Sequence, residues 1–156
     1  MKTHNYSLTI EWTGNEGTGT STYTSYKRNY DISGKSKYSE IKGSSDPAFR
    51  GDPKRYNPED LLVASLSSCH MLCYLHLCAV NNIVVLKYID NAFGTMEENA
   101  NGGGKFNSVV LRPSVTISSN SDREKALKLH HEANQLCFIA NSCNFKVDHE
   151  PSIIMG

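Results

Sequence analysis

Residues 57–80 read NPEDLLVASLSSCHMLCYLHLCAV, and this stretch predicts one long helix. Asn57 is a favourable N-cap, Pro58 suits the first helical position, and Glu59 begins a pair of carboxylates at the positive end of the helix dipole. From Leu61 onward the sequence is apolar nearly all round. Because a helix that is apolar on every side is normally a central one, we expect it to be buried against a sheet, another helix or a second subunit.

The sequence before this helix is expected to form strands and a loop. Residues 5–13 alternate apolar and polar side chains, which is typical of a half-buried strand. Residues 18–26 are rich in Thr and Tyr, so we predict a second strand there that pairs with the first. Residues 37–42 give a weaker strand signal. Residues 43–57 contain two prolines and two glycines and are predicted to be loop.

The sequence after the helix predicts a hairpin, a second helix and a last strand. Residues 83–94 and 106–117 have strand-like patterns, and a glycine-rich tip between them indicates a hairpin. Residues 119–122 provide capping side chains for a second helix. The expected apolar face of that helix consists of Ala126, Leu129, Ala133, Leu136 and Cys137. Residues 145–147 are predicted to form a short final strand.

Composition narrows the class of protein. Lys plus Arg and Asp plus Glu number 16 each, and no basic run is present, so we expect no nucleic acid or membrane partner. The N-terminus has no apolar signal core, and serines and histidines interrupt the helix of residues 61–80, which argues against a membrane span. We therefore expect a cytoplasmic protein with an α+β fold in a single domain, residues 1–156.

Five cysteines in such a chain are expected to be reduced thiols. Cys69, Cys73 and Cys78 lie in the first helix, and Cys137 and Cys143 lie near the end of the second. A single helical cysteine is more often a small core residue than a reagent. The spacing contains no Cys-x-x-Cys pair, so we expect no metal. A cysteine in each of two helices nevertheless favours redox chemistry.

Two motifs in the chain resemble the OsmC/Ohr peroxidase family. The run NPEDLL at 57–62, followed by Ser68 and Cys69, is similar to the Asn-Pro-Glu-x-Leu … Ala-Cys signature of that family. The run ANQLCFIANS at 133–142 is similar to the family's second-cysteine segment. The resemblance covers nearly the whole chain. It implies an OsmC-like fold in which strands wrap around two buried helices and two copies form an intertwined homodimer.

The resemblance also implies roles for individual residues. The chain would be a cofactor-free, cysteine-based peroxidase that reduces organic hydroperoxides with a dithiol reductant. Cys69 would be the peroxidatic thiol and Cys137 the resolving thiol, while Glu59 would position an arginine over the first sulfur. The spacing makes Arg50 the better match for that arginine, with Arg55 as the fallback, as in the OsmC branch of the family.

The chemistry can be argued independently of the resemblance. Peroxide cleavage needs a thiolate, whereas an ordinary cysteine with a pKa of ~8.5 is mostly protonated at neutral pH. Cys69 is too far from the start of its helix for the dipole to help, so we expect a cation beside it. Attack would leave a sulfenic acid on Cys69, and Cys137 would condense with it to a disulfide that a dithiol reopens.

Other interpretations remain open at this point. One is an OsmC-like protein without peroxidase activity that binds a small ligand or senses redox state through Cys69 and Cys137. A weaker one is a metal or electrophile trap that uses the cysteines of the first helix. His70 could act as an extra base, but we expect a hydrogen-bonded core histidine, and we expect His130 and His131 on the helix surface. Apolar residues near the cysteines favour lipid or alkyl hydroperoxides as substrates.

Overall fold

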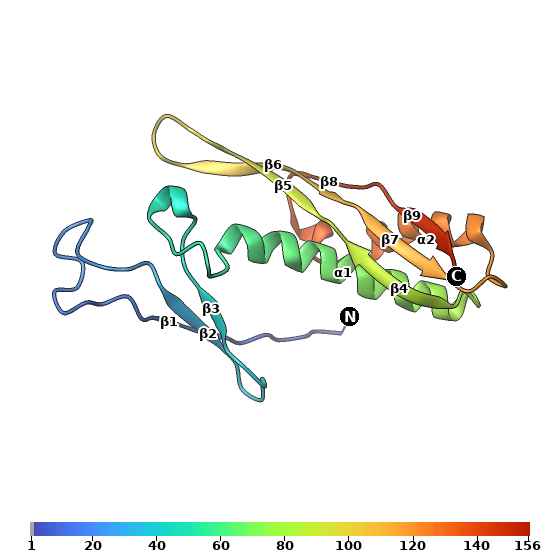
Figure 1. Ribbon diagram of the computed structural model, residues 1–156, viewed down its shortest axis with the longest axis horizontal. Helices are drawn as coiled ribbons and strands as arrows, with labels where there is room; N and C mark the ends of the chain where they lie inside the picture. The colour runs from blue at the N-terminus through green and yellow to red at the C-terminus, as the bar shows by residue number, and fades with distance from the viewer. Residues whose placement is uncertain (1) are drawn as a thin grey trace. The chain divides into compact units, whose positions relative to one another are not determined.

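The computed structural model describes residues 2–156, which divide into two compact units (Figure 1). The N-terminal unit ends at Leu61, and the C-terminal unit comprises Leu62–Gly156. Strands and two helices make the fold α+β, as predicted. Each unit is described by itself below.

The N-terminal unit contains a three-stranded antiparallel sheet of β1 (Thr9–Trp12), β2 (Tyr30–Ser33) and β3 (Ile41–Gly43), in that order. The expected strand at 5–13 is confirmed only over β1, and all four of its residues are exposed rather than half-buried. The weak strand expected at 37–42 corresponds to β3. The sheet is therefore smaller than the sequence pattern suggested.

The strand predicted at 18–26 is wrong, because this segment forms successive turns. The Ser25 hydroxyl donates to the carbonyl oxygens of Gly19 and Thr22, each at 3.0 Å, and the Asn15 side chain accepts the Gly19 N–H at 3.0 Å. Such local side-chain bonds satisfy the backbone without a strand partner. β1 therefore pairs with β2, which lies beyond the turns.

The loop predicted at 43–57 is confirmed apart from a short 3₁₀ turn, η1 (Pro47–Phe49), and the long helix that follows is α1 (Pro58–Val80). The Asn57 side chain accepts the Asp60 N–H at 2.7 Å, and the Asp60 carboxylate accepts the Asn57 N–H at 3.1 Å. This reciprocal capping box confirms the predicted helix start. The helix ends where Asn82 adopts a φ of 60°, the left-handed conformation common after helices.

One stripe of α1 is buried within the described chain, and burial of its other faces by a second subunit stays a prediction. The buried residues are Leu66, His70, Tyr74, Leu77 and Cys78. Leu72 and Val80, by contrast, are each 62% exposed. By length and composition alone α1 could cross a membrane, a test that the core helix of a soluble protein also passes.

The C-terminal unit contains two three-stranded sheets, ordered β4-β7-β9 and β5-β6-β8. The strands are β4 (Val85–Asp90), β5 (Phe93–Glu98), β6 (Gly104–Leu111), β7 (Pro113–Ile117), β8 (Lys146–His149) and β9 (Ser152–Met155). The predicted hairpin is present, but each of its long strands is broken into two. The Asp90 carboxylate accepts the Arg112 N–H at 2.6 Å where both breaks meet.

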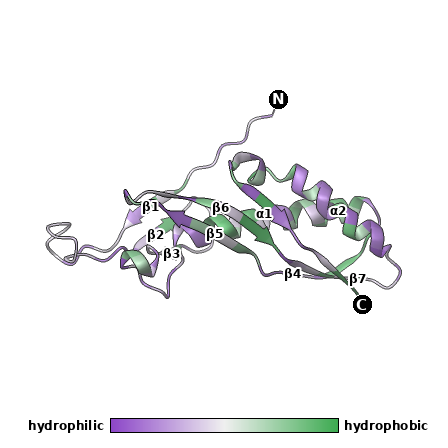
Figure 2. Cartoon of the chain, turned by 90° about the horizontal axis from the view of Figure 1, so that it is seen from above, coloured by the Kyte–Doolittle hydropathy of each residue, from purple (hydrophilic) through white to green (hydrophobic). Residues whose placement is uncertain are grey.

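The second helix is α2 (Arg123–Leu136), and its predicted cap is confirmed because the Asp122 side chain accepts the Lys125 N–H at 3.0 Å. Hydrophilic and hydrophobic residues alternate along α2, as expected of a helix with one buried face (Figure 2). The predicted final strand corresponds to β8, which pairs in parallel with β6. β9, which pairs in parallel with β7, was not predicted.

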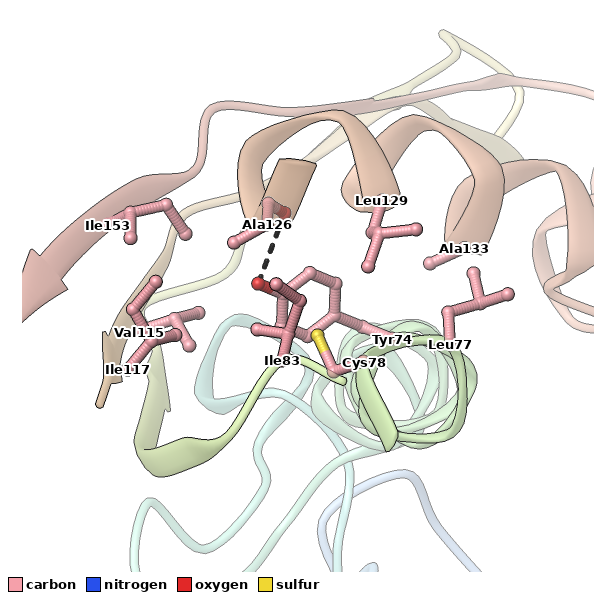
Figure 3. Packing of buried hydrophobic residues seen from close by; sticks show 10 residues of the cluster. All are labelled: Tyr74, Leu77, Cys78, Ile83, Val115, Ile117, Ala126, Leu129, Ala133 and Ile153. Carbon is pink, nitrogen blue, oxygen red and sulfur yellow. Dashed lines mark hydrogen bonds between the residues drawn. The ribbon is translucent and has the colours of Figure 1, made fainter. Parts of the chain in front are cut away.

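The main core joins α1, α2 and the β7–β9 side of the C-terminal unit (Figure 3). Tyr74 of α1 is fully buried, and its hydroxyl donates to the Ala126 carbonyl of α2 at 3.2 Å. A second cluster around Leu66 includes Ile139 and Ala140, which follow α2. The two cysteine-bearing helices are thus packed together, and the chain after α2 is held against α1.

Candidate active site

The two helices bring the predicted pair of cysteines together. Cys69 lies in the middle of α1 and is partly exposed, whereas Cys137 caps the C-terminus of α2 and is 1% exposed. The groups that act on the pKa of the Cys69 thiol include the Cys137 thiol and the backbone N–H groups of Phe138 and Ile139. All these groups belong to the C-terminal unit.

This environment favours a thiolate at Cys69. Burial raises the pKa of the Cys69 thiol, but hydrogen bonding from the Cys137 thiol, from the N–H groups of Ile139 and Phe138 and from the Cys73 thiol outweighs it. The pKa of Cys69 is therefore lower than that of an ordinary cysteine, because these donors stabilise the charged form. Neutral donors therefore act in the same direction as the cation that was expected beside Cys69.

The environment of Cys137 has the opposite effect. Burial, together with the neighbouring Cys69, raises the pKa of Cys137 to about 12, although the Ala140 N–H donates to its sulfur at 3.4 Å. Of the two thiols, Cys69 therefore loses its proton first and Cys137 retains its proton. Two titratable groups whose pKa values are driven apart in this way have distinct chemical roles.

The remaining cysteines differ in their surroundings. Cys73, one helical turn after Cys69, has a pKa raised by burial and by the nearby Cys69 sulfur, to which its thiol donates. Cys78 is buried in the main core, and burial raises its pKa, so it packs as a small apolar residue. Cys143 packs at the edge of the second cluster. Residues 2–156 contain no group of three or more His, Cys, Asp or Glu side chains that could hold a metal ion.

The other predicted site residues lie in the N-terminal unit. Glu59 is in the first turn of α1, and its Oε2 atom is buried without a hydrogen-bond partner among the described residues. A buried carboxylate oxygen without a partner is costly, so Glu59 is suited to receive a cation.

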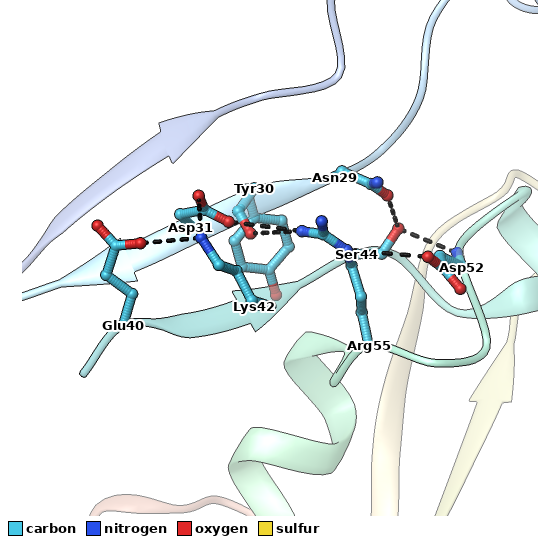
Figure 4. A network of polar contacts seen from close by, with 8 residues as sticks. All are labelled: Asn29, Tyr30, Asp31, Glu40, Lys42, Ser44, Asp52 and Arg55. Atoms are coloured by element: carbon cyan, nitrogen blue, oxygen red, sulfur yellow. Dashed lines mark hydrogen bonds and ion pairs between the residues drawn. The ribbon is translucent and has the colours of Figure 1, made fainter.

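The two candidate arginines are engaged differently. Arg55 forms ion pairs with Asp31 at 3.4 Å and Asp52 at 3.8 Å within a polar network (Figure 4). Arg50 forms no ion pair with any described residue, and its guanidinium carbon lies 5.9 Å from the centre of the Tyr23 ring. Its φ of 65° is an uncommon conformation for a residue other than glycine. Arg50 is thus the arginine whose charge is available, while Arg55 is held by carboxylates.

The histidines correct one expectation and confirm another. His70 is a fully buried core residue, as predicted, and its Nε2 atom lies 3.0 Å from Nδ1 of His130. His130 is also fully buried, so its predicted place on the helix surface is wrong. It lies between Ala126 and Ala133 on the apolar face of α2, and this spacing was the signal in the sequence for its burial.

The backbone N–H groups of Phe138 and Ile139 were also missed by the sequence analysis. They reach Cys69 because α2 stops at Leu136 and the chain turns back through the 3₁₀ turn η2 (Ala140–Ser142). No side-chain pattern marks such donors. Only the early stop of α2 after Leu136 could have suggested them.

Known proteins resemble this chain in sequence and in fold. A family model described as OsmC-like protein matches residues 51–152. No curated protein matches the chain. A solved OsmC-like protein of unknown function from Vibrio cholerae is 32% identical, with a TM-score of 0.84 over 96% of this chain and 100% of that one.

Two more distant structures are named as organic hydroperoxide resistance proteins. The one from Elizabethkingia anophelis is 20% identical, with a TM-score of 0.69 and coverage of 100% of both chains. The one from Legionella pneumophila is 17% identical, with a TM-score of 0.67 over 97% of this chain and 98% of that one. These two likenesses concern the fold. On the family match and the Vibrio relative, this chain belongs to the OsmC-like protein family.

Proposed function

We propose that this protein is a thiol peroxidase that reduces organic hydroperoxides through Cys69 and Cys137. The observation that carries the proposal is the pair itself, in which one sulfur has a lowered pKa and the other is a buried, protonated neighbour. The names of the Elizabethkingia and Legionella proteins support a hydroperoxide as the substrate. Family membership is compatible with this chemistry.

In the first step the Cys69 thiolate attacks the terminal oxygen of the hydroperoxide. A sulfur–oxygen bond forms, the oxygen–oxygen bond breaks, and the alkoxide takes a proton and leaves as an alcohol. Cys69 is oxidised to a sulfenic acid and the peroxide is reduced. The donors that lower the pKa of Cys69 increase the fraction of thiolate at a given pH.

In the second step Cys137 attacks the Cys69 sulfenic sulfur, forming a disulfide and releasing water. Oxidation removes the negative charge of Cys69, and with it one of the causes that raise the pKa of Cys137. Cys137 therefore becomes easier to deprotonate only after Cys69 has reacted. The Ala140 N–H, 3.4 Å from the Cys137 sulfur, supports the new thiolate. An external dithiol then reduces the disulfide by thiol exchange.

The proposal extends to Arg50, Glu59 and a second copy of the chain. In this proposal the guanidinium of Arg50, rather than that of Arg55, binds the peroxide oxygen, because Arg55 is held by two carboxylates. The buried Glu59 oxygen would orient that guanidinium. The exposed apolar side chains of α1, such as Leu72, support a homodimer in which the partner covers them. A cytoplasmic location would supply the dithiol.

The test is consumption of cumene hydroperoxide with excess dithiothreitol, comparing wild type with three cysteine variants. We expect turnover in wild type, none in Cys69→Ser, and a trappable sulfenic acid on Cys69 in Cys137→Ser. Cys143→Ser is the matched control and should keep wild-type turnover. Absence of turnover in wild type with several hydroperoxides and dithiols would sink the enzyme assignment. It would favour the ligand-binding or redox-sensing alternative.

A further inference from the structure

A pair of histidines joins the two helices that carry the reactive cysteines. His70 of α1 and His130 of α2 are both fully buried, and His70 Nε2 lies 3.0 Å from His130 Nδ1. The two rings are nearly coplanar, with an interplanar angle of 7°. This is the geometry of a direct hydrogen bond between neutral imidazoles, in which one ring donates and the other accepts.

The pair lies close to both sulfurs along the chain. His70 follows Cys69 directly, and His130 precedes Cys137 by seven residues, which is about two helical turns on the same face. A change in how α2 sits on α1 at the histidines therefore changes the approach of Cys137 to Cys69. The histidine bond and the approach of the two sulfurs therefore both depend on the position of α2 along α1.

Neighbouring groups hold the pair in a fixed orientation. The Tyr74 ring stacks on His130 with ring centres 3.7 Å apart, and the Tyr74 hydroxyl donates to the Ala126 carbonyl at 3.2 Å. The His149 ring centre is 5.6 Å from that of His70. An apolar contact would tolerate sliding of one helix on the other, whereas a hydrogen bond at 3.0 Å is directional.

Stability alone does not account for the pair. His70 Nδ1 and His130 Nε2 are buried and have no partner among the described residues. Leaving a buried polar atom without a partner is destabilising, so two apolar residues of similar size would be at least as stable. What the imidazoles provide in addition is a defined orientation between the helices.

We propose that His70 and His130 are positioning residues for the second step of the reaction, holding α2 on α1 so that Cys137 reaches the oxidised Cys69. This inference rests on the proposed peroxidase function. The pair does not touch the peroxide in this scheme. The first step needs α2 only to bring the donors after Leu136 near Cys69, whereas formation of the disulfide needs Cys137 itself to reach the oxidised sulfur.

The test compares two double variants in a single turnover. His70→Leu/His130→Leu removes the bond and leaves no polar atom unpaired. His70→Gln/His130→Asn places one amide near the position of His70 Nε2 and the other near that of His130 Nδ1, so a hydrogen bond between the helices can form again. Reduced protein is mixed with one equivalent of cumene hydroperoxide. Peroxide loss and disulfide formation are followed separately, and dimedone traps the sulfenic acid.

We expect peroxide loss to slow less than disulfide formation in the leucine pair and to stay near the wild-type rate in the amide pair. Disulfide formation should slow about tenfold or more in the leucine pair, since even a 1 Å misplacement can cost ~100-fold in rate. It should recover to within about threefold of wild type in the amide pair. His76→Leu, which changes an exposed histidine of α1 outside the pair, is the control and should leave the disulfide rate unchanged.

A folded leucine pair that forms the disulfide at the wild-type rate would overturn the inference. If the leucine pair does not fold, the disulfide rates of the single variants His130→Asn and His130→Gln are compared instead. Both variants carry an amide, but only that of Asn matches the position of His130 Nδ1. Equal disulfide rates in those two variants would also overturn it. A wild-type protein that forms no disulfide at all would instead refute the proposed function, so the two failures are distinguishable.

Discussion

Acid should destabilise the C-terminal unit through its buried histidines. Burial lowers the pKa of His70 to about 4 and that of His130 to about 3, with further lowering from neighbouring histidines. In the unfolded chain both would titrate near ~6.5. The unfolded state therefore binds more protons once the pH falls below that value, and the stability present above it is lost progressively down to the folded-state pKa values.

The size of the loss in the free energy of unfolding follows from the pH interval over which the unfolded histidines take up protons. Between pH 6.5 and pH 5 each unfolded histidine gains a proton while its folded counterpart remains neutral, which costs about 2 kcal/mol per histidine at 1.36 kcal/mol per pH unit. The two together lower the free energy of unfolding by about 4 kcal/mol between pH 7.5 and pH 5. The carboxylates and His149 titrate as well, so the comparison must be made against a variant.

The assay is urea unfolding under reducing conditions at pH 7.5 and at pH 5, followed by circular dichroism at 222 nm. This signal reports on α1 and α2, most of whose residues lie in the C-terminal unit. His70→Leu/His130→Leu should lose about 4 kcal/mol less than wild type over this interval. An equal loss in wild type and variant would refute the reasoning that both histidines are buried as neutral groups.

Three further predictions concern the cysteine pair and the elements that hold it. Cys137→Ala should raise the pKa of Cys69, because it removes a hydrogen-bond donor, while Cys137→Ser should largely preserve that pKa. The pH dependence of iodoacetamide alkylation of Cys69 measures the pKa in each variant. Identical pH profiles for the two variants would contradict the role of Cys137 as donor. Leu66→Ala should destabilise the protein by about 2–5 kcal/mol, because Leu66 is fully buried, and a loss well below that range in urea unfolding would contradict the packing. Asn57→Ala should cost about 1 kcal/mol by removing the 2.7 Å cap on the Asp60 N–H, and an unchanged urea midpoint would argue against that cap.

The features predicted correctly from the sequence are those that depend on neighbouring residues. The start of α1 was predicted because Asn57 and Asp60 satisfy each other's backbone within one turn. The cap of α2 at Asp122 is equally local. The cysteine pair was expected from the resemblance of two motifs to the OsmC/Ohr family; the packing of α1 on α2 brings Cys69 and Cys137 together, and their roles stay a prediction.

Two of the missed features depend on distant partners, whereas the turns at 18–26 depend on local side-chain bonds. The turns at 18–26 replaced a strand because Ser25 and Asn15 satisfy the backbone locally, which overrides a composition rich in Thr and Tyr. β9 is only four residues long, and its parallel partner β7 is remote in sequence. His130 was assigned to the surface because histidine is polar, yet its partner lies 60 residues away on α1. His130 does follow the apolar spacing of α2, whereas the turns at 18–26 and β9 leave no such pattern in a single sequence.

The central claim is that Cys69 and Cys137 form one redox pair, and one measurement tests it most directly. Reduced protein is treated with one equivalent of cumene hydroperoxide, alkylated, digested and analysed by mass spectrometry. We expect a single major cross-linked product that joins the Cys69 and Cys137 peptides, with one equivalent of alcohol released. Stoichiometric peroxide loss with Cys137 still alkylated, or a disulfide between Cys69 and a different cysteine, would contradict the claim.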